Sequence, residues 1–366
     1  MTTTLPVGAT AHTFDSAGTR CAAWHFAATS DELARPAGRP VAVLAHGFGG
    51  TKDSGLAPFA TALAGAGIDA LAFDFRGFGA SAGEPRQRLR MRDQIADYRA
   101  AVSAAARLPG VDPERVVLWG VSMSGGHVLA LAAEYSATRD ATGGSRAGGT
   151  RGVAARLRGA GQAAAEPREA GGVATGPQVA DTAAVGPRGQ AVAAAQPRVA
   201  AVVSLTPLVD GPAAVRHAVR HGGPLASLRG AAGGVRAGIA RLRGEPGLIP
   251  LVGAPGSGAA LSLDGYERSY RALSGPTWQN GIDPAVLLTL PGYRPARRAA
   301  DITVPVLMQI ADFDRAAPPH AAAKAAFAAR AEVRHYPCDH FDVWPGGDFH
   351  PAAVEHQLHF LRRHLG

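Results

Sequence analysis

The 366-residue chain is 46% hydrophobic and 18% charged, which suits one large globular domain or two smaller ones and excludes fibrous, collagen-like and fully disordered proteins. Its two cysteines, Cys21 and Cys338, exclude a disulfide framework and have no Cys-x-x-Cys spacing for a metal or redox site. The net charge is +8, and almost all of the positive charge comes from arginine, because only Lys52 and Lys324 are lysines. Ala, Gly, Arg and Pro are frequent throughout the chain. The excess of positive charge is therefore better explained by this general composition than by a nucleic-acid-binding surface.

The N-terminal residues carry no recognisable targeting signal. Residues 1–6 lack the basic region and the apolar region of a secretory signal peptide. Along the chain, no uncharged apolar run approaches the ~20 residues that a membrane-spanning helix needs. We therefore expect a cytoplasmic protein without a membrane span.

Short apolar runs alternate with helical patterns along the chain. The runs have flanking turn residues and no polar alternation, which is typical of strands covered on both faces. They lie at 41–45, 69–73, 116–119, 199–205 and 304–310, and the helical patterns lie at 56–66, 93–107, 125–135, 319–329 and 352–364. The alternation predicts a doubly wound α/β fold with a mostly parallel sheet and helices on both faces.

Two stretches interrupt this pattern. Residues 137–198 contain no aromatic residue and hold eight arginines against four acidic residues among many Gly, Ala and Pro. Such a segment buries too little surface to offset its ordering entropy, so we predict a low-complexity, disordered insertion between 1–136 and 199–366, the two parts of one domain. Residues 206–300 contain short helical and Gly/Pro-rich pieces, which predict a helical lid over the carboxyl edge of the sheet.

A serine follows the run at 116–119 in a setting that favours a nucleophile. Residues 120–126 read Gly-Val-Ser-Met-Ser-Gly-Gly and join a strand to an apolar helix, with small residues two positions before and after Ser122. A sharp turn requires those small residues, and it exposes the serine hydroxyl at a helix N-terminus, where the dipole favours developing negative charge. Ser124 offers a second frame, but Ser122 lies directly at the strand end. A Gly/Ser-rich turn without chemistry is the remaining alternative.

Glycines after the first apolar run provide room for an oxyanion hole. Residues 46–50 read His-Gly-Phe-Gly-Gly, and glycines let a loop approach a reacting centre and aim a main-chain N–H at it. The N–H groups of Phe48 and Met123 are the candidate donors. We expect His46 to support this loop. A phosphate-binding loop does not fit, because the Gly-Lys-Ser/Thr ending and the Gly-x-Gly-x-x-Gly spacing are both missing.

Together with a third motif, these two sequences resemble the α/β-hydrolase superfamily. The third motif is Asp-x-Arg-Gly-x-Gly-x-Ser at 74–81. Within the superfamily, the chain is similar to bacterial serine hydrolases that include esterases, acyl-peptide-hydrolase-like proteins and polyketide-transferase-like proteins. The resemblance covers about 20–135 and 199–366, and it implies an α/β-hydrolase sheet. It also implies that Asp74 and Arg76 brace their loop through internal ion pairing rather than act in catalysis.

The resemblance implies the chain order nucleophile, acid, base, with the acid after the seventh strand. The run at 304–310 fits that strand, and aligning the prolines that follow it places the acid at Asp314. Asp312 is the alternative in the same loop. Asp210 is a further candidate, because some members of the superfamily carry the acid after the sixth strand. The non-catalytic alternative for each aspartate is a loop turn or a helix cap.

The base is expected in the loop after the last strand. His340 matches the histidine of the family's Gly-His-Phe-Asp type of loop, with Asp339 where glycine is usual. This exchange predicts a changed loop geometry or a changed histidine pKa. His335 falls within the strand and is expected to be structural, and Cys338 is expected to pack.

These residues predict acyl chemistry with Ser122 as nucleophile, His340 as base and Asp314 as the acid that orients it. The expected enzyme is a carboxylesterase-like serine hydrolase that cleaves a carboxylic ester or related acyl bond through an acyl-enzyme. An acyltransferase of the polyketide-transferase type, a thioesterase and a peptidase use the same residues and stay open. No metal or organic cofactor is expected. The expected partner is a small-molecule acyl substrate, no nucleic acid is expected, and homo-oligomerisation stays open.

Side chains of the predicted lid indicate the substrate class. Its apolar and aromatic residues favour a medium acyl or aromatic substrate over a sugar, although most of them are expected to pack the lid on the core. They are Leu248, Ile249, Pro250, Leu251, Val252, Tyr266, Tyr270, Trp278, Val286, Leu287, Leu288, Leu290 and Tyr293. Arginines of the same stretch either attract a carboxylate or phosphate or form a solvated basic face.

Overall fold

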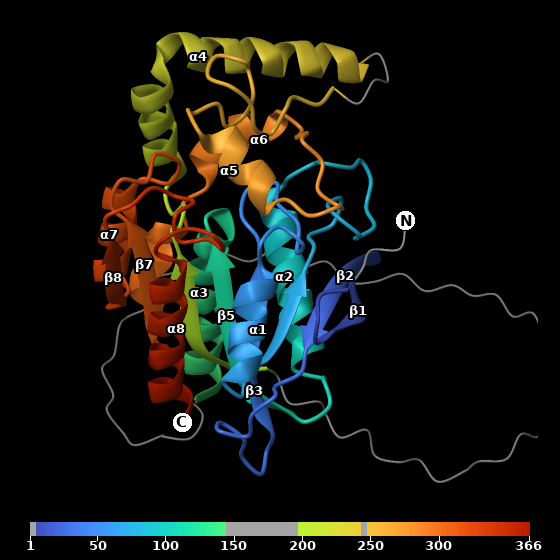
Figure 1. Cartoon of the computed structure of the whole chain (residues 1–366), viewed down its shortest axis with the longest axis vertical. Coiled ribbons are helices and arrows are strands. Elements are labelled where there is room, and N and C mark those ends of the chain that lie inside the picture. The colour runs from blue at the N-terminus through green and yellow to red at the C-terminus, as the bar shows by residue number, and fades with distance from the viewer. Residues whose placement is uncertain (1–4, 144–196, 243–246) are drawn as a thin grey trace, which may run out of the picture. The chain divides into compact units, whose positions relative to one another are not determined.

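In the part of the chain that the structure describes, eight strands form one sheet in the order β1-β2-β4-β3-β5-β6-β7-β8 (Figure 1). They are β1 (Ala9–Ser16), β2 (Thr19–Phe26), β3 (Arg39–Ala45), β4 (Asp69–Phe73), β5 (Val111–Val121), β6 (Val199–Leu205), β7 (Val306–Ala311) and β8 (Glu332–Tyr336). β2 pairs antiparallel with β1 and β4, whereas the other pairings are parallel. The predicted mostly parallel sheet is confirmed.

This architecture comes from a computed structural model that describes residues 5–143, 197–242 and 247–366. The chain divides into two units, Met1–Asp140 with Gln196–Gly366, and Ala141–Ala195, and the sheet belongs to the first. Most of the predicted insertion at 137–198 lies outside the described residues. At its start, helix α3 (Met123–Gly143) runs past the expected helix end at 135.

Alternate residues of the central strands face two separate hydrophobic cores, because side chains two apart in a strand point to the same side. Val41 and Val43 of β3 pack in one core with α2 (Met91–Ala105), α3 and α7 (Pro319–Ala328). Ala42 and Leu44 pack in the other core with α1 (Ala57–Gly65) and α8 (His350–Leu365). All four strand residues are fully buried. Helices therefore cover both faces of the sheet, as the uninterrupted apolar runs predict.

The hairpin β1–β2 is absent from the predicted elements. Its strands lie at one end of the sheet and mix buried with exposed residues instead of forming an apolar run. Its turn residues, Ala17 and Gly18, have φ of 50° and 79°. Two consecutive positive φ values are typical of a type I′ hairpin turn, but Ala-Gly lacks the asparagine or aspartate that marks such a turn in a sequence.

The β6–β7 segment, residues 206–305, leaves the sheet and returns to it. It contains α4 (Gly211–Leu242), α5 (Tyr266–Leu273), α6 (Ala285–Thr289) and two 3₁₀ turns, η1 (Leu290–Gly292) and η2 (Pro295–Asp301). In Figure 1, α4, α5 and α6 lie beyond the carboxyl ends of the strands. Short helices are expected here, but α4 spans 32 residues with a break at Gly223, where φ is 79° and ψ is 160°. No helix in the described ranges is long and apolar enough to cross a membrane.

Candidate active site

Ser122 occupies the turn between β5 and α3. Its φ of 57° is a left-handed conformation that few residues other than glycine adopt. Gly120 lies so close to the main chain of Ser124 that a Cβ atom there would overlap the Ser124 carbonyl group. The Ser122 side chain is 8% exposed and reaches the cavity described below. The turn thus has the strained backbone of the sharp strand-to-helix turn that the sequence predicts around Ser122.

Ser124 holds the turn together. Its side chain is completely buried, and its hydroxyl oxygen accepts a hydrogen bond from the Val121 N–H at 2.9 Å and donates one to the Ala45 carbonyl at 2.6 Å. These bonds tie the turn to the end of β3. Serine in place of the usual glycine therefore has a structural use here, and its hydroxyl does not face the cavity that Ser122 lines.

His340 and Asp314 form a buried pair at the carboxyl edge of the sheet. Nδ1 of His340 lies 2.7 Å from Oδ2 of Asp314, and the two residues are 4% and 3% exposed. Oδ1 of Asp314 accepts hydrogen bonds from the N–H groups of Ala316 (2.8 Å) and Ala317 (2.7 Å), which fix the carboxylate. A carboxylate on Nδ1 keeps the proton there in the neutral imidazole and leaves Nε2 free to accept one.

The two alternative aspartates have other partners. Asp312 pairs with Nδ1 of His335 of β8 at 2.6 Å, and both side chains are exposed. Asp210 accepts a hydrogen bond from the Ala213 N–H at 2.8 Å at the start of α4, which makes it a helix cap. Of the three aspartates, the structure brings only Asp314 against His340.

Opposing effects set the pKa of His340. Burial lowers it by disfavouring the charged imidazole, but the charge of Asp314, the hydrogen bond to Asp314 and the charge of Asp339 all raise it. The net shift of the His340 pKa is upward from the ordinary 6.5.

Asp339 connects the histidine loop to two other parts of the site. Its Oδ1 accepts hydrogen bonds from the Tyr266 hydroxyl (2.7 Å), the Arg315 N–H (3.0 Å) and the His340 N–H (2.7 Å), and its Oδ2 accepts from Nε of Arg315 (2.6 Å). Burial raises the pKa of Asp339, but these donors outweigh burial and hold the pKa below its usual value. The expected glycine would provide none of these bonds. Asp339 thereby joins α5, the loop that carries Asp314 and the loop that carries His340.

The Gly47–Phe48 peptide lies against Ser122. A Cβ atom added to Gly47 would lie 2.8 Å from Cβ of Ser122 and 3.3 Å from its Oγ, so only glycine allows this approach. The Ser122 carbonyl accepts a hydrogen bond from the Leu208 N–H at 2.9 Å, which fixes the peptide plane that carries the Met123 N–H. Among the described residues, neither the Phe48 N–H nor the Met123 N–H has an acceptor.

His46 supports the glycine loop. Its Nδ1 lies 3.0 Å from the Gly47 carbonyl, and its ring contacts Phe75 edge to face. Burial lowers the pKa of His46 and the charge of Asp74 offsets this only in part, so the ring is neutral at pH 7 and donates from Nδ1. This bond fixes the peptide plane that carries the Phe48 N–H.

Asp74 and Arg76 brace their loop through two separate ion pairs. Asp74 binds Nζ of Lys52 at 2.6 Å, and Arg76 binds Asp97 at 2.5 Å. Both carboxylates are fully buried. The two residues are structural, but each pairs with a different partner rather than with the other.

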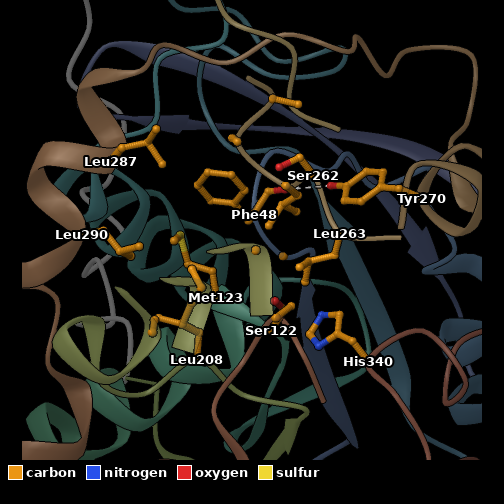
Figure 2. Close-up of a pocket in the computed structure, with 18 of the residues that line it drawn as sticks. Phe48, Ser122, Met123, Leu208, Ser262, Leu263, Tyr270, Leu287, Leu290 and His340 are labelled. Atoms are coloured by element: carbon orange, nitrogen blue, oxygen red, sulfur yellow. Dashed lines mark hydrogen bonds between the residues drawn. The ribbon is translucent and has the colours of Figure 1, made fainter. Parts of the chain in front are cut away.

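Ser122 and His340 line one cavity of about 720 Å³. Figure 2 shows the two side chains beside each other, with Phe48, Leu287 and Leu290 lining the same space. The walls are mostly apolar, and the lining side chains that carry a hydroxyl or a charge besides the candidate pair include Ser54, Ser262, Tyr270 and Arg315. Of the apolar and aromatic residues expected in the lid, those that line the cavity are Tyr270, Leu287, Leu288 and Leu290, and several others are core residues.

Two tyrosines of the β6–β7 segment hold the main chain next to the candidate oxyanion donors. The Tyr270 hydroxyl donates to the Phe48 carbonyl at 2.7 Å (Figure 2), and the Tyr293 hydroxyl donates to the Met123 carbonyl at 2.9 Å. Tyr293 also lies 2.8 Å from Nδ1 of His127. Sequence reasoning gives both tyrosines only as apolar surface, because their partners lie 222 and 170 residues away and leave no local pattern.

The described ranges contain no group of three or more His, Cys, Asp or Glu side chains placed to hold a metal ion. Cys21 and Cys338 are buried and form no disulfide. Cys338 packs in the core that includes α1 and α8, as expected.

Comparisons with known proteins match this chain to one family model and to several named proteins. A family model described as serine aminopeptidase, S33, matches residues 36–143. The quorum-quenching protein AidA of Acinetobacter baumannii (strain MDR-ZJ06) is 28% identical over 354 residues, which cover 96% of this chain and 93% of that protein. The thiohydrolase aneE of Aspergillus aculeatus (strain ATCC 16872 / CBS 172.66 / WB 5094) is 42% identical over 93 residues, which cover 25% of this chain and 29% of aneE.

Among solved structures, the α/β hydrolase GrgF from Penicillium sp. sh18 matches with a TM-score of 0.65. Its sequence is 22% identical, and the match covers 99% of both chains. At this identity, the likeness shows a shared fold.

Proposed function

We propose that this chain, a member of the α/β-hydrolase superfamily, is a serine hydrolase that cleaves a carboxylic ester or related acyl bond through an acyl-enzyme. One observation carries the proposal: Ser122, in its strained turn, lines the same cavity as His340, which is paired with Asp314. A serine hydroxyl alone is a weak nucleophile, so such an enzyme needs a base oriented by a third group. These three residues supply that arrangement.

The mechanism follows from the roles that the contacts allow. His340 accepts the Ser122 proton as Oγ attacks the substrate carbonyl, while Asp314 keeps the proton on Nδ1 and stabilises the imidazolium that forms. The N–H groups of Phe48 and Met123 bind the oxyanion, and each such donor typically lowers the barrier by about 3 kcal/mol. His340 then protonates the leaving alcohol. Water, activated by the same histidine, attacks the acyl-enzyme and releases the acid.

The cavity supports an apolar acyl group as substrate. A volume of about 720 Å³ lies within the range of small-molecule sites, and the mostly apolar walls favour a medium-chain or aromatic acyl group over a sugar. In this proposal, the β6–β7 segment serves as the lid, because α4, α5 and α6 contribute to the cavity wall. A thioester is the second candidate substrate, and the local identity to the thiohydrolase aneE favours it.

Hydrolysis of p-nitrophenyl esters of increasing acyl length tests the proposal. We expect medium-chain esters to be preferred over acetate, and we expect Ser122→Ala to lower kcat by at least about 10⁴-fold. Ser262→Ala is the matched control, because it removes another hydroxyl that lines the cavity, and it should retain activity. Wild-type activity in Ser122→Ala would contradict the proposal. Product analysis with added alcohols, amines and thioesters distinguishes hydrolysis from acyl transfer.

A further inference from the structure

Apolar side chains on α4 and α6 continue the cavity wall onto the outer surface. Val215, Val219, Val235 and Ile239 of α4 are 38%, 39%, 65% and 46% exposed, and Leu288 of α6 is 83% exposed. All except Ile239 also line the cavity that contains Ser122. Single exposed apolar residues are common on protein surfaces, but a group of exposed apolar residues that also lines a cavity indicates a binding surface. We call these five residues the apolar rim.

Arginines flank the apolar rim on α4. Residues 211–242 include five arginines and two histidines but no aspartate or glutamate. Arg216 and Arg220 follow Val215 and Val219 by one position, and Arg236 follows Val235, so arginines lie beside apolar rim residues both before and after the break at Gly223. The three arginines are exposed and, within the described part of the chain, are in no ion pair.

This combination favours one partner. A helix that places apolar side chains next to arginines, without acidic residues, has the composition of a helix that lies on an anionic lipid surface. A second copy of the chain fits less well, because a symmetric contact would bring the arginines of two α4 helices together. Acidic side chains of a protein partner would pair with the arginines, but they would not account for the exposed apolar side chains of the apolar rim. The described ranges hold no membrane-spanning helix, so contact with lipid would be peripheral.

We propose that the apolar rim, with Arg216, Arg220 and Arg236, docks on anionic lipid surfaces. Docking would bring the cavity opening to the lipid, so that an apolar acyl substrate passes from the lipid phase into the cavity without crossing water. The docking itself does not depend on catalysis. The route of the substrate rests on the proposed function of Ser122.

Vesicle binding of the full-length Ser122→Ala protein tests the docking separately from catalysis. We expect co-sedimentation with vesicles of phosphatidylcholine and phosphatidylglycerol, weak binding to phosphatidylcholine alone, and loss of binding in high salt. Arginines near an anionic lipid surface each contribute several-fold to binding, so Arg216→Gln/Arg220→Gln/Arg236→Gln should weaken it about 100-fold. The control Arg20→Gln/Arg107→Gln/Arg297→Gln changes the net charge equally at exposed positions outside α4 and should keep most of the binding.

Two further measurements complete the test. In the catalytically active background, the α4 triple variant should hydrolyse a water-soluble short ester at the wild-type rate but lose activity on a medium-chain ester dissolved in anionic vesicles. Ile239→Ser should weaken vesicle binding without changing the sedimentation coefficient of the free protein. Three results would overturn the proposal: equal binding to neutral and anionic vesicles, a dimer that Ile239→Ser dissociates, or binding to an acidic acyl carrier protein without binding to vesicles.

Discussion

At the scale of single residues, Asp339 places a negative charge beside His340, which the glycine usual at this position in the superfamily would not. Its carboxylate lies next to His340, the proposed base, accepts the His340 N–H and adds to the charge that raises the His340 pKa. In the proposed mechanism, only the neutral imidazole of His340 accepts the Ser122 proton, so activity should fall as the pH drops through the His340 pKa. Because that pKa is raised, we expect the acid limb of kcat/KM to have its midpoint above 6.5.

Asp339→Asn should move this midpoint to lower pH, because it removes a negative charge that favours the imidazolium. The pH dependence of kcat/KM for a soluble ester measures the shift. Tyr266→Phe is the control, since it removes one hydrogen bond to Asp339 but leaves its charge, and it should leave the midpoint near the wild-type value. Lower activity in Asp339→Asn with an unchanged midpoint would reduce Asp339 to a structural residue.

Gly47 offers a test of the oxyanion hole. Gly47→Ala should push the Phe48 N–H away from the reacting carbonyl, because the added Cβ would lie 2.8 Å from Cβ of Ser122. Loss of one oxyanion donor corresponds to a decrease in kcat of about 10²–10³-fold, measured by ester hydrolysis alongside thermal unfolding. Gly65→Ala, at a glycine with no atom within 4 Å of the added Cβ, should behave like wild type. Full activity in Gly47→Ala would assign the oxyanion to other donors.

The residues that sequence reasoning finds differ in kind from those it misses. Ser122 belongs to a local motif, and the superfamily's chain order leads to Asp314 and His340 as candidates. Tyr270 and Tyr293 act through hydroxyl groups that bond to carbonyls, and any residue has a carbonyl. Nothing in the sequence identifies such an acceptor, so these tyrosines become visible only once the chain is folded.

At the scale of elements, the buried parallel strands and the helices between them are predicted well, because burial on both faces requires continuous apolar runs. The hairpin β1–β2 lies at the end of the sheet, where this requirement is weaker. The length of α4 is missed for another reason. Gly and Pro within 211–242 suggest interruptions, but the helical backbone is broken at Gly223 alone.

The start of α3 depends on a polar network that α2 and the β6–β7 segment share. Tyr293 bonds to the Met123 carbonyl and to His127, which also lies 2.9 Å from Gln94. Burial lowers the pKa of His127 to about 3. The ring therefore stays neutral and cannot compensate for a lost partner by ionising.

Tyr293→Phe should destabilise the protein by about 1–3 kcal/mol, because it leaves buried polar groups without a partner. Urea unfolding measures the change. Tyr135→Phe provides the comparison at a partly buried tyrosine of α3, and we expect it to have a smaller effect. Equal stability of Tyr293→Phe and wild type would show that water or a rearranged Gln94 replaces the hydroxyl.

At the scale of the whole molecule, the described strands and every candidate site residue lie outside residues 144–196. Replacing these residues by a flexible Gly/Ser linker should leave ester hydrolysis unchanged and shift the melting temperature by less than about 4 °C. Loss of soluble, active protein would mean that the segment contributes to the fold or the site. Salt-sensitive binding of nucleic acid that disappears with the segment would contradict our expectation of no nucleic-acid partner.

The central claim is that Ser122 is the nucleophile and that its serine neighbour in the turn is not. Labelling with a fluorophosphonate, followed by peptide mapping of the adduct, tests it most directly. The account predicts one adduct per chain on Ser122, no labelling of Ser122→Ala, and retained labelling of folded Ser124→Ala. An adduct on another residue, or undiminished labelling of Ser122→Ala, would contradict it.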